Sequence, residues 1–494
     1  MSLFGASYLL QVALAHPAQP NLVFILADDL GYNELGFMNA SRGIHSPHLD
    51  SLARQGVILK NFYVQPMCSP TRSALMTGRV PLCVGMQSNV ILADTPWAVD
   101  LAETFLQQNL QDAGYDTAMF GKWHLGMFRQ SAWPTARGFQ EHMGFMHGCS
   151  SKATHITTCC RAGEPTGDLH YVCPASKKGP GSSRGYDWFK SGGGHRSQAD
   201  PSANETSSAK LIGDAAVEYI QRKAGGPKPF FLYLPFQNIH EPYTVEPRFR
   251  AIYSQRTDIT EEEVTMWGYI SEMDEQVGRV VSTLKATGIY KNTIIVFSSD
   301  NGAPSVKGVS REDEIVPGLG AAWSRRNFPF RGHKFQIWEG GVRVPAFVHY
   351  WMLPDEIKGT ESQALLHITD WLPTLVSLAG GSTRRNRPLD GFNIWPAILG
   401  NPNPRHEMLY NVNPLQSSIG TPPAGGIRIG DWKLLVYSYQ VNGVNGSNMT
   451  GPDSWGPADF VDGLALYNLA EDPRETSNVV RERPELVLRM LETW

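Results

Sequence analysis

NLVFILADD, residues 21–29, joins a continuous apolar run to two carboxylates. A run of this kind, without alternation of polar and apolar residues, is typical of a parallel strand that is covered on both faces. Residues 21–27 therefore predict a buried strand, and Asp28 and Asp29 follow directly at its carboxyl end.

Two further apolar runs end in the same way. TIIVFSS, residues 293–299, is followed by Asp300 and Asn301, and PFFLYLPF, residues 229–236, precedes His240. Polar residues therefore gather just beyond strand ends, which is where open α/β sheets place their ligands.

Amphipathic helix patterns separate these strands. One of them opens with Thr260 and Glu263 in the spacing of a capping box. Helices are expected within residues 101–114, 207–226, 260–284 and 368–380. The alternation of strands and helices predicts an α/β fold, in which helices cover both faces of a sheet.

The pattern changes twice along the chain. Residues 149–206 are rich in Gly, Ser, Pro and Cys and have no sustained period, which is typical of a functional or disordered loop. After about residue 400, short strand patterns and a final helix pattern over 484–494 indicate a smaller α+β unit. We therefore expect a large domain over residues 20–400 and a second domain over 401–494.

Composition and charge exclude some classes of protein. The formal net charge of -4 and the lack of a basic run with interleaved aromatic residues argue against nucleic acid as the main partner. No apolar stretch reaches the roughly 20 residues that a membrane span needs.

The N-terminal segment and four glycosylation patterns suggest the secretory route. Residues 1–15 have an apolar centre and an Ala-Leu-Ala end, which predicts a signal peptide, with an irregular terminal helix as the alternative. The N-x-[ST] acceptor patterns, each weak alone, lie at Asn39, Asn204, Asn445 and Asn448.

The six cysteines do not form a dense disulfide framework. Four of them crowd into one region, where one or two bridges would restrain a segment with little core of its own: Cys149, Cys159, Cys160 and Cys173. A zinc cluster is the alternative, but no CxxC pair occurs. Cys68 and Cys83 stand apart from this group.

Oxygen ligands from two strand ends could hold a metal ion. Asp28, Asp29, Asp300 and Asn301 offer three carboxylates and one amide, which suit a hard cation, with Ca²⁺ favoured over Mg²⁺. The alternative is that these residues cap turns or helices.

Four basic side chains could bind a compact anion beside such a metal. Lys122 and His124 are two residues apart at an expected strand end, so they should point to one side. His240 follows the third apolar run, and Lys334 lies in RGHKFQIWEGGVR. Together with a cation, these groups could share the charge of an anion.

Cys68 begins the helix pattern CSPTRSALMTG, in which Pro70 suits the first turn and Gly78 suits the end. Arg72 lies one turn after Cys68, on the same face. A thiol beside a cation at a helix N-terminus is expected to have a depressed pKa, which would make Cys68 a thiolate nucleophile. A buried structural cysteine is the alternative.

CSPTR, residues 68–72, resembles the C-x-P-x-R signature of the type I sulfatases. Further segments resemble that family in the same order: LADDLGYNELGF, GKWHLGMFR, QNIHEPY, SSDNG and RGHKFQIWEGGVR. The resemblance covers about residues 20–480 and is closest to the animal N-acetylgalactosamine-4-sulfatases. It implies an alkaline-phosphatase-like α/β fold, with a mixed, mostly parallel sheet and a smaller C-terminal α+β domain containing an antiparallel sheet.

The resemblance also implies a modified residue and one metal ion. A formylglycine-generating enzyme would oxidise Cys68 in the endoplasmic reticulum to formylglycine, whose aldehyde hydrates to a geminal diol that Arg72 orients. One Ca²⁺, which also contacts the modified Cys68 and a sulfate oxygen, would be held by Asp28, Asp29, Asp300 and Asn301.

The remaining roles follow from the same resemblance. Lys122, His240 and Lys334 would hold the sulfate, and Asp300 would take a proton from the attacking hydroxyl. His240 with Lys334 would protonate the departing oxygen, and His124 would take a proton from the second hydroxyl, which expels sulfate.

Two alternative functions remain open at this point. Phosphate mono- and diester hydrolases share this fold but use Ser or Thr and usually two Zn²⁺, whereas Cys68 and Asn301 favour one hard cation and sulfate. A sulfatase-like protein that binds sulfated glycans without turnover would keep Cys68 unmodified.

The chain departs from the family's pattern at Cys83, within 149–206 and at 303–327, which leaves the sugar specificity and the disulfide pairing open. The expected substrate is an aryl sulfate or a sulfated glycan, above all sulfated N-acetylgalactosamine in glycosaminoglycans. The lysosome and secretion are equally expected locations.

Overall fold

A computed structural model describes residues 19–87, 89–92, 95–155, 186–191, 197–304, 325–412, 424–437 and 460–493. The predicted signal peptide, Asn445 and Asn448 lie outside the described residues. Cys149 is disulfide-bonded, in line with the expected bridges, and Cys159, Cys160 and Cys173 lie outside the described residues.

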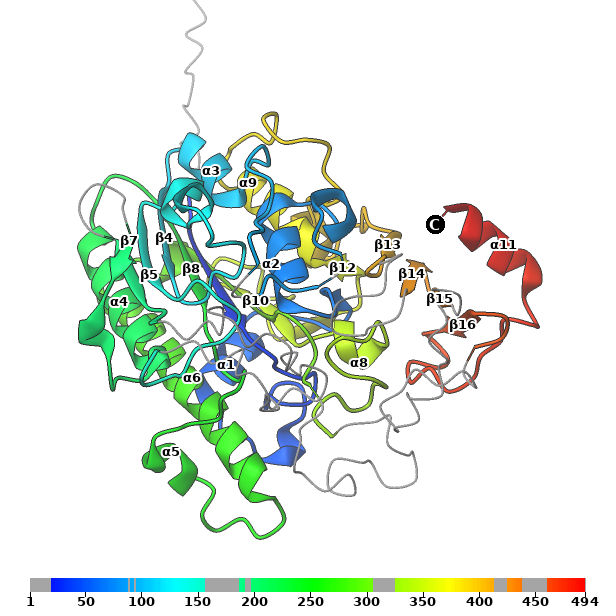
Figure 1. Ribbon diagram of the computed structural model, residues 1–494, viewed down its shortest axis with the longest axis horizontal. Coiled ribbons are helices and arrows are strands. Elements are labelled where there is room, and N and C mark those ends of the chain that lie inside the picture. Colours follow the sequence, from blue (N-terminus) through cyan, green and yellow to red (C-terminus); the bar gives the residue numbers. More distant parts are fainter. Residues whose placement is uncertain are drawn as a thin grey trace, which may run out of the picture.

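A ten-stranded sheet forms the centre of the molecule, in the order β11-β2-β10-β9-β1-β8-β4-β5-β6-β7 (Figure 1). Its strands are β1 (Asn21–Ala27), β2 (Val57–Leu59), β4 (Asp116–Phe120), β5 (Glu141–Gly144), β6 (Phe189–Ser191), β7 (Ser197–Ala199), β8 (Phe230–Pro235), β9 (Thr293–Ser299), β10 (Ala346–Tyr350) and β11 (Thr360–Ser362). The run from β9 to β5 is parallel, whereas β10, β6 and β7 pair antiparallel with their neighbours. A two-stranded parallel sheet, β3 (Phe62–Tyr63) with β12 (Leu366–His367), lies apart from it.

Helices cover both faces of the large sheet, as the sequence predicts. Val23 and Ile25 of β1 pack with the helices of one face, and Leu22 and Phe24 pack with those of the other. The first face carries α1 (Pro47–Arg54), α4 (Ser208–Lys223) and α6 (Glu261–Ala286), and the second carries α2 (Cys68–Thr77), α3 (Leu106–Asp112) and α9 (Trp371–Leu378). The remaining described helices of the large unit are α5 (Pro247–Ala251), α8 (Glu339–Val342) and α10 (Trp395–Ile398).

A second, four-stranded antiparallel sheet forms from the C-terminal part of the chain, in the order β13-β14-β15-β16. Its strands are β13 (Glu407–Leu409), β14 (Ala424–Ile429), β15 (Trp432–Tyr437) and β16 (Leu464–Asn468), and α11 (Pro484–Thr493) follows them. Val487 and Met490 of α11 share a small apolar cluster with Leu434 and Leu466 of the sheet.

Two sequence predictions about elements need correction. The helix expected over 101–114 begins only at Leu106, because the carbonyls of Asp100 and Glu103 accept hydrogen bonds from Arg137 instead of continuing a helix. The stretch 149–206, expected to lack regular structure, contributes β6 and β7 to the edge of the large sheet. Strands of three residues are too short to carry a periodic signal.

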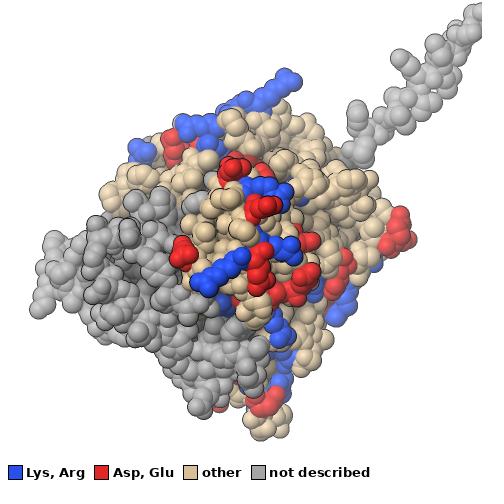
Figure 2. Space-filling view, turned by 90° about the vertical axis from the view of Figure 1, so that its right-hand side faces the viewer, with Lys and Arg blue, Asp and Glu red and all other residues tan. Residues whose placement is uncertain are grey.

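The described part of the chain has no helix with both the length and the apolar character that a membrane span requires. Lys and Arg side chains are interspersed with Asp and Glu side chains on the described part of the face in Figure 2, without a broad area of one sign. This mixture agrees with the small net charge of -4.

Candidate active site

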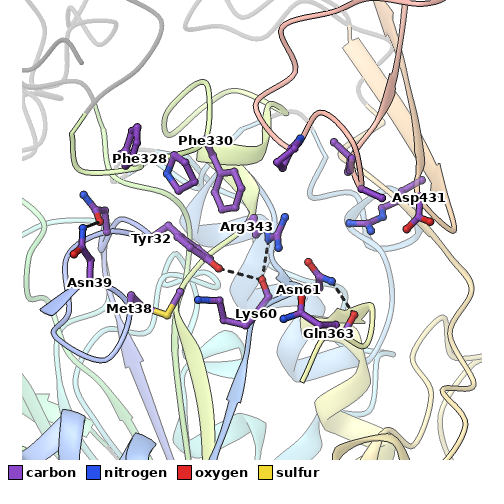
Figure 3. A pocket seen from close by; sticks show the side chains of 16 residues that line it. Tyr32, Met38, Asn39, Lys60, Asn61, Phe328, Phe330, Arg343, Gln363 and Asp431 are labelled. Carbon is purple, nitrogen blue, oxygen red and sulfur yellow. Dashed lines mark hydrogen bonds between the residues drawn. The ribbon is translucent and has the colours of Figure 1, made fainter. Parts of the chain in front are cut away.

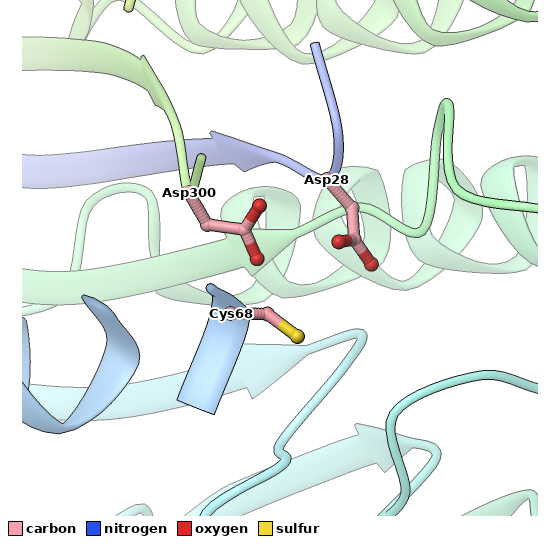
Figure 4. Close-up of side chains that lie close together, drawn as sticks. All are labelled: Asp28, Cys68 and Asp300. Atoms are coloured by element: carbon pink, nitrogen blue, oxygen red, sulfur yellow. The ribbon is translucent and has the colours of Figure 1, made fainter. Parts of the chain in front are cut away.

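Two strand ends bring the predicted metal ligands together. Because β1 and β9 are parallel neighbours with Ala27 opposite Ser299, Asp28 and Asp300 leave the sheet side by side (Figure 4). Asp29 has a positive φ of 64°, and its backbone N–H donates to Asp300 Oδ1 at 3.3 Å. All three carboxylates are buried. A left-handed residue next to Asp28 is a strained conformation that recurs at functional sites.

Cys68 is the first residue of α2 and faces these carboxylates (Figure 4). Its Sγ and one oxygen each of Asp28 and Asp300 all lie within 4.8 Å of one another. The helix ends at Gly78, whose φ of 67° fits the expected C-cap.

The expected thiolate is not supported by the structure. Burial raises the pKa of the Cys68 thiol to about 11, and Asp300 and Asp28 add to this effect, whereas Lys122 and Lys334 oppose it. The helix N-terminus and Arg72 would lower the pKa of the Cys68 thiol. Desolvation outweighs them because the thiol is buried.

Arg72 ties the helix to both strand ends. Its Nε and Nη2 donate to Asp300 Oδ2 at 3.1 and 2.8 Å, and its Nη1 donates to the carbonyl of Lys122 at 3.0 Å. The buried guanidinium therefore fixes the orientation of the Asp300 carboxylate relative to Cys68. Asp300 itself has a pKa raised to about 6, by burial first and by Asp28 second.

Each of two lysines is paired with one carboxylate. Lys122 Nζ donates to Asp28 Oδ2 at 2.6 Å, and Lys334 Nζ lies 2.8 Å from Asp29 Oδ1. His240 Nε2 lies 3.7 Å from the same Asp29 carboxylate. Although burial alone would raise the pKa of Asp29, Lys334 and His240 hold it well below its usual range. Asp29 is therefore ionised.

His124 lies beyond the end of β4 with a φ of 58°, so the alternation of a strand does not decide where it points. Its Nε2 is 3.0 Å from the carbonyl oxygen of Ile91, so this nitrogen carries the proton. Nδ1 has no hydrogen-bond partner within the described residues. Burial, followed by Lys122 and Arg72, lowers the pKa of the ring, which is therefore neutral with a bare Nδ1.

The donor set fits a hard cation. Asp28 Oδ1 and Asn301 Oδ1 are buried and lack a hydrogen-bond partner among the described residues, and oxygen atoms of this kind are the ligands that Ca²⁺ prefers. Asn301 Nδ2 donates to Asp29 Oδ1 at 2.7 Å, which places the amide beside the carboxylates. A cation here would meet oxygens that no group in the described part of the chain satisfies.

The formal charges of six buried groups in the site cancel. The three carboxylates are offset by three buried cations, Arg72, Lys122 and Lys334. Addition of a divalent cation would leave the site positive by two charges in a water-poor environment. Such a site would attract an anionic group strongly.

One buried lysine near the site was not predicted from the sequence. Lys152 lies in the stretch 149–206, where no periodicity or motif singled it out, and its Nζ lies 3.2 Å from the centre of the Tyr269 ring. Burial lowers its pKa, although Glu272, Asp28 and Asp29 act in the opposite direction. The ammonium group has no hydrogen-bond partner among the described residues.

Comparison with known proteins agrees with this geometry. The family model described as Sulfatase matches residues 20–382. Mouse arylsulfatase J is 34% identical, over 97% of this chain and 76% of that protein. Human arylsulfatase G is 32% identical over 80% and 72%, and mouse N-acetylgalactosamine-6-sulfatase is 28% identical over 94% and 82%.

Solved structures share the fold along almost the whole chain. The crystal structure of Ps i-CgsB in complex with k-i-k-neocarrahexaose is 26% identical, with a TM-score of 0.72 over 96% of this chain and 92% of that one. A sulfatase from Pseudoalteromonas sp., PsFucS1, has a TM-score of 0.70 at 22% identity and supports the fold alone. The expected alkaline-phosphatase-like fold with its C-terminal antiparallel sheet is confirmed.

Proposed function

This chain belongs to the sulfatase family and hydrolyses sulfate esters, and we propose that it does so with a formylglycine made from Cys68 and one bound Ca²⁺. The observation that carries this proposal is the position of Cys68. It lies within 4.8 Å of two buried carboxylates, yet its thiol has a pKa of about 11 and is therefore a poor nucleophile.

Oxidation of Cys68 would remove this difficulty. As a geminal diol, residue 68 would supply one hydroxyl for attack on sulfur and a second whose deprotonation releases the sulfate. We propose that a formylglycine-generating enzyme makes this change during synthesis, on the secretory route that the N-terminal segment suggests.

Asp28, Asp29, Asp300 and Asn301 would hold the Ca²⁺ in the proposed site. Bound there, the cation would supply charge that polarises a sulfate oxygen. Asp28 Oδ1 and Asn301 Oδ1, which have no hydrogen-bond partner among the residues that the structure describes, support this assignment.

The chain's own residues would move the protons. Asp300, held by Arg72 and with a pKa of about 6, can accept a proton from the attacking hydroxyl. His240 and Lys334 both lie beside the Asp29 carboxylate, and they would donate a proton to the departing oxygen. The bare Nδ1 of His124 suits acceptance of the last proton.

The substrate that we propose is sulfated N-acetylgalactosamine in a glycosaminoglycan. The 28% identity to an N-acetylgalactosamine-6-sulfatase over 94% of this chain supports this sugar class, and the sequence resemblance favours the 4-sulfate. Residence in the lysosome or secretion would bring the enzyme to such glycans.

Four measurements on the purified protein test this proposal. Mass spectrometry of the peptide that contains residue 68 should find an aldehyde or its hydrate, and an intact thiol in active protein would contradict the nucleophile. Aryl sulfate should be hydrolysed and aryl phosphate should not, which separates sulfatase from phosphatase activity.

Removal of divalent cations with a chelator should abolish hydrolysis, and Ca²⁺ should restore it. Among sulfated mono- and disaccharides, the 4-sulfate of N-acetylgalactosamine should be the best substrate. Preference for a 6-sulfate or an N-sulfate would contradict the proposed 4-sulfate specificity but not the sulfatase activity.

A further inference from the structure

A cavity of about 640 Å³ shares no lining residue with the proposed catalytic centre (Figure 3). Several parts of the chain line it: the loop that follows Asp29, the residues directly after β2, β11 and α8, the segment 328–330, and the end of β14 with the turn before β15 and the chain after β16. The cavity therefore lies where the C-terminal sheet meets the edge of the large sheet.

Aromatic rings form one wall of this cavity. Tyr32 and Phe330 meet edge to face with ring centres 4.6 Å apart, and Phe328 lies next to Phe330 (Figure 3). Tyr32 and Phe330 are buried, and the Arg343 guanidinium lies 4.5 Å from the centre of the Phe330 ring. Phe328 is half-buried, so it is the ring that offers apolar surface to the C–H face of a sugar, at low cost in side-chain entropy.

Amide side chains lie opposite the rings. Asn61 Nδ2 donates to the carbonyl of Gln363 at 2.7 Å, which leaves the oxygen and the second N–H of Asn61 available within the described structure. The Gln363 side chain is exposed at the same edge (Figure 3). Amides can both donate to and accept from sugar hydroxyls.

The charge of the cavity favours an anionic ligand. Lys60, Arg343 and Arg428 line it, and Asp431 is the only acidic residue among the described residues that do so. Arg343 and Arg428 are buried; Arg343 lies 3.4 Å from the Glu339 carboxylate and Arg428 donates to the carbonyl of Gly430, so Lys60 is the cation that a ligand would meet. Lys60 Nζ contacts the exposed Glu361 carboxylate at 3.5 Å, a weak surface pair that leaves N–H groups free for a ligand.

Two short connections fix the distance between the cavity and the catalytic centre. Tyr32 follows Asp29 by three residues, and Lys334 follows Phe330 by four. Four extended residues span at most about 14 Å, so the Cα atoms of Tyr32 and Phe330 lie within that distance of the Cα atoms of Asp29 and Lys334, respectively. One oligosaccharide could therefore reach both places.

We propose that this cavity binds an acidic sugar unit of the same glycan whose sulfate is hydrolysed, next to the hydrolysed unit. The inference rests on the proposed function, since it deepens the assignment of a glycosaminoglycan substrate. It predicts that long substrates gain affinity that a monosaccharide cannot gain.

The test measures binding in the Cys68→Ala background, where no turnover occurs. The probes are a chondroitin 4-sulfate hexasaccharide and N-acetylgalactosamine 4-sulfate. Phe328→Ala and, separately, Lys60→Met should each weaken hexasaccharide binding about tenfold, which is about 1.4 kcal/mol, and leave the monosaccharide unchanged. Phe392→Ala is the matched control, because Phe392 is an exposed ring with an arginine 5.0 Å above it, away from the cavity.

Equal weakening of both probes, unchanged hexasaccharide binding, or no hexasaccharide binding in the Cys68→Ala background would each overturn the proposal. The unfolding midpoints of Phe328→Ala and Lys60→Met should match that of their parent. Failure of the proposed function gives a different result: the unmutated enzyme would hydrolyse aryl sulfate but no sulfated sugar, while the hexasaccharide still bound through Phe328.

Discussion

Burial limits what Cys68 can do as a thiol. With a pKa near 11, only about one molecule in ten thousand would carry a thiolate at pH 7. The neighbouring Lys122 and Lys334 lower this pKa, but desolvation acts more strongly because the Cys68 side chain is buried. The residue therefore becomes useful by conversion to another chemical group, not by ionisation.

Replacement of Cys68 by serine tests this conclusion. Cys68→Ser keeps the size and the hydrogen-bonding capacity of the side chain but cannot form a diol, so we expect hydrolysis of aryl sulfate to fall by about 10³-fold or more. The unfolding midpoint should change little. Cys83→Ser is the control, because Cys83 is a free, exposed cysteine, and it should retain full activity. Activity of Cys68→Ser within tenfold of the parent would refute the diol.

Arg72 acts through the planar, forked geometry of its guanidinium group. Arg72→Lys keeps the positive charge but cannot donate to Asp300 and to the Lys122 carbonyl together, so kcat should fall by about 10²-fold. The free energy of unfolding should fall by about 2 kcal/mol, because buried charged groups lose hydrogen bonds. Arg387→Lys, at a half-exposed ion pair, should change neither quantity measurably. Equal effects in both variants would contradict a role of the fork.

At the scale of elements, α6 stabilises the start of α1. Ser46 makes no side-chain capping bond to α1, and Asp274 of α6 instead accepts from the backbone N–H groups of His48 and Leu49 at 3.1 and 2.7 Å. Burial raises the pKa of Asp274 to about 7 from the usual 3.8, although both hydrogen bonds act to lower it. The cap therefore titrates near neutral pH.

This cap predicts how stability depends on pH. Between about pH 4 and 7 the folded protein keeps a proton that the unfolded chain has released, so the contribution of Asp274 to stability falls as pH rises, by about 1.4 kcal/mol per unit. Asp274→Asn lacks this titration. Urea unfolding at pH 5, 6 and 7 should show the free-energy difference between parent and variant falling with pH. For the exposed control Asp355→Asn, the difference in unfolding free energy from the parent should be the same at all three pH values. If the difference were also constant for Asp274→Asn, the Asp274 carboxyl group would be ionised in the folded protein over this range.

Elements with a strong local signal were predictable from sequence. The apolar run of β1 and the capping box of α6 each carry their signal within a few neighbouring residues, and both form as expected: Thr260 Oγ1 accepts from the N–H of Glu263, and Glu263 accepts in return. The edge strands β6 and β7 were missed because three residues are too few to carry a periodic signal, and because β6 joins the large sheet through a non-local pairing with β5. At the site, the residues beyond strand ends were brought together as expected, whereas Lys152 and the raised pKa of Cys68 depend on burial that only the tertiary structure sets.

At the scale of the whole molecule, a buried ionic network joins the two sheets. Lys433 of β15 lies 2.9 Å from Glu339 of α8 and 2.7 Å from Glu475, which follows β16. Tyr63 donates to the Glu339 carboxylate at 2.6 Å, so the large unit contributes a hydroxyl as well. Since α8 begins five residues after Lys334, the network also anchors the segment that carries a proposed catalytic lysine.

Loss of the Lys433 charge should therefore lower both the stability of the protein and its catalytic rate. Lys433→Met leaves the buried Glu339 and Glu475 without their shared partner, and breaking a buried pair from one side costs about 3–5 kcal/mol. We expect a lower unfolding midpoint and a lower kcat for aryl sulfate. The matched control is Lys358→Met, which removes a lysine from an ion pair with the exposed Asp355 and should cost less than about 1 kcal/mol. A midpoint that moves no further in Lys433→Met than in Lys358→Met would show that apolar packing, not this network, holds the C-terminal sheet against the catalytic segment.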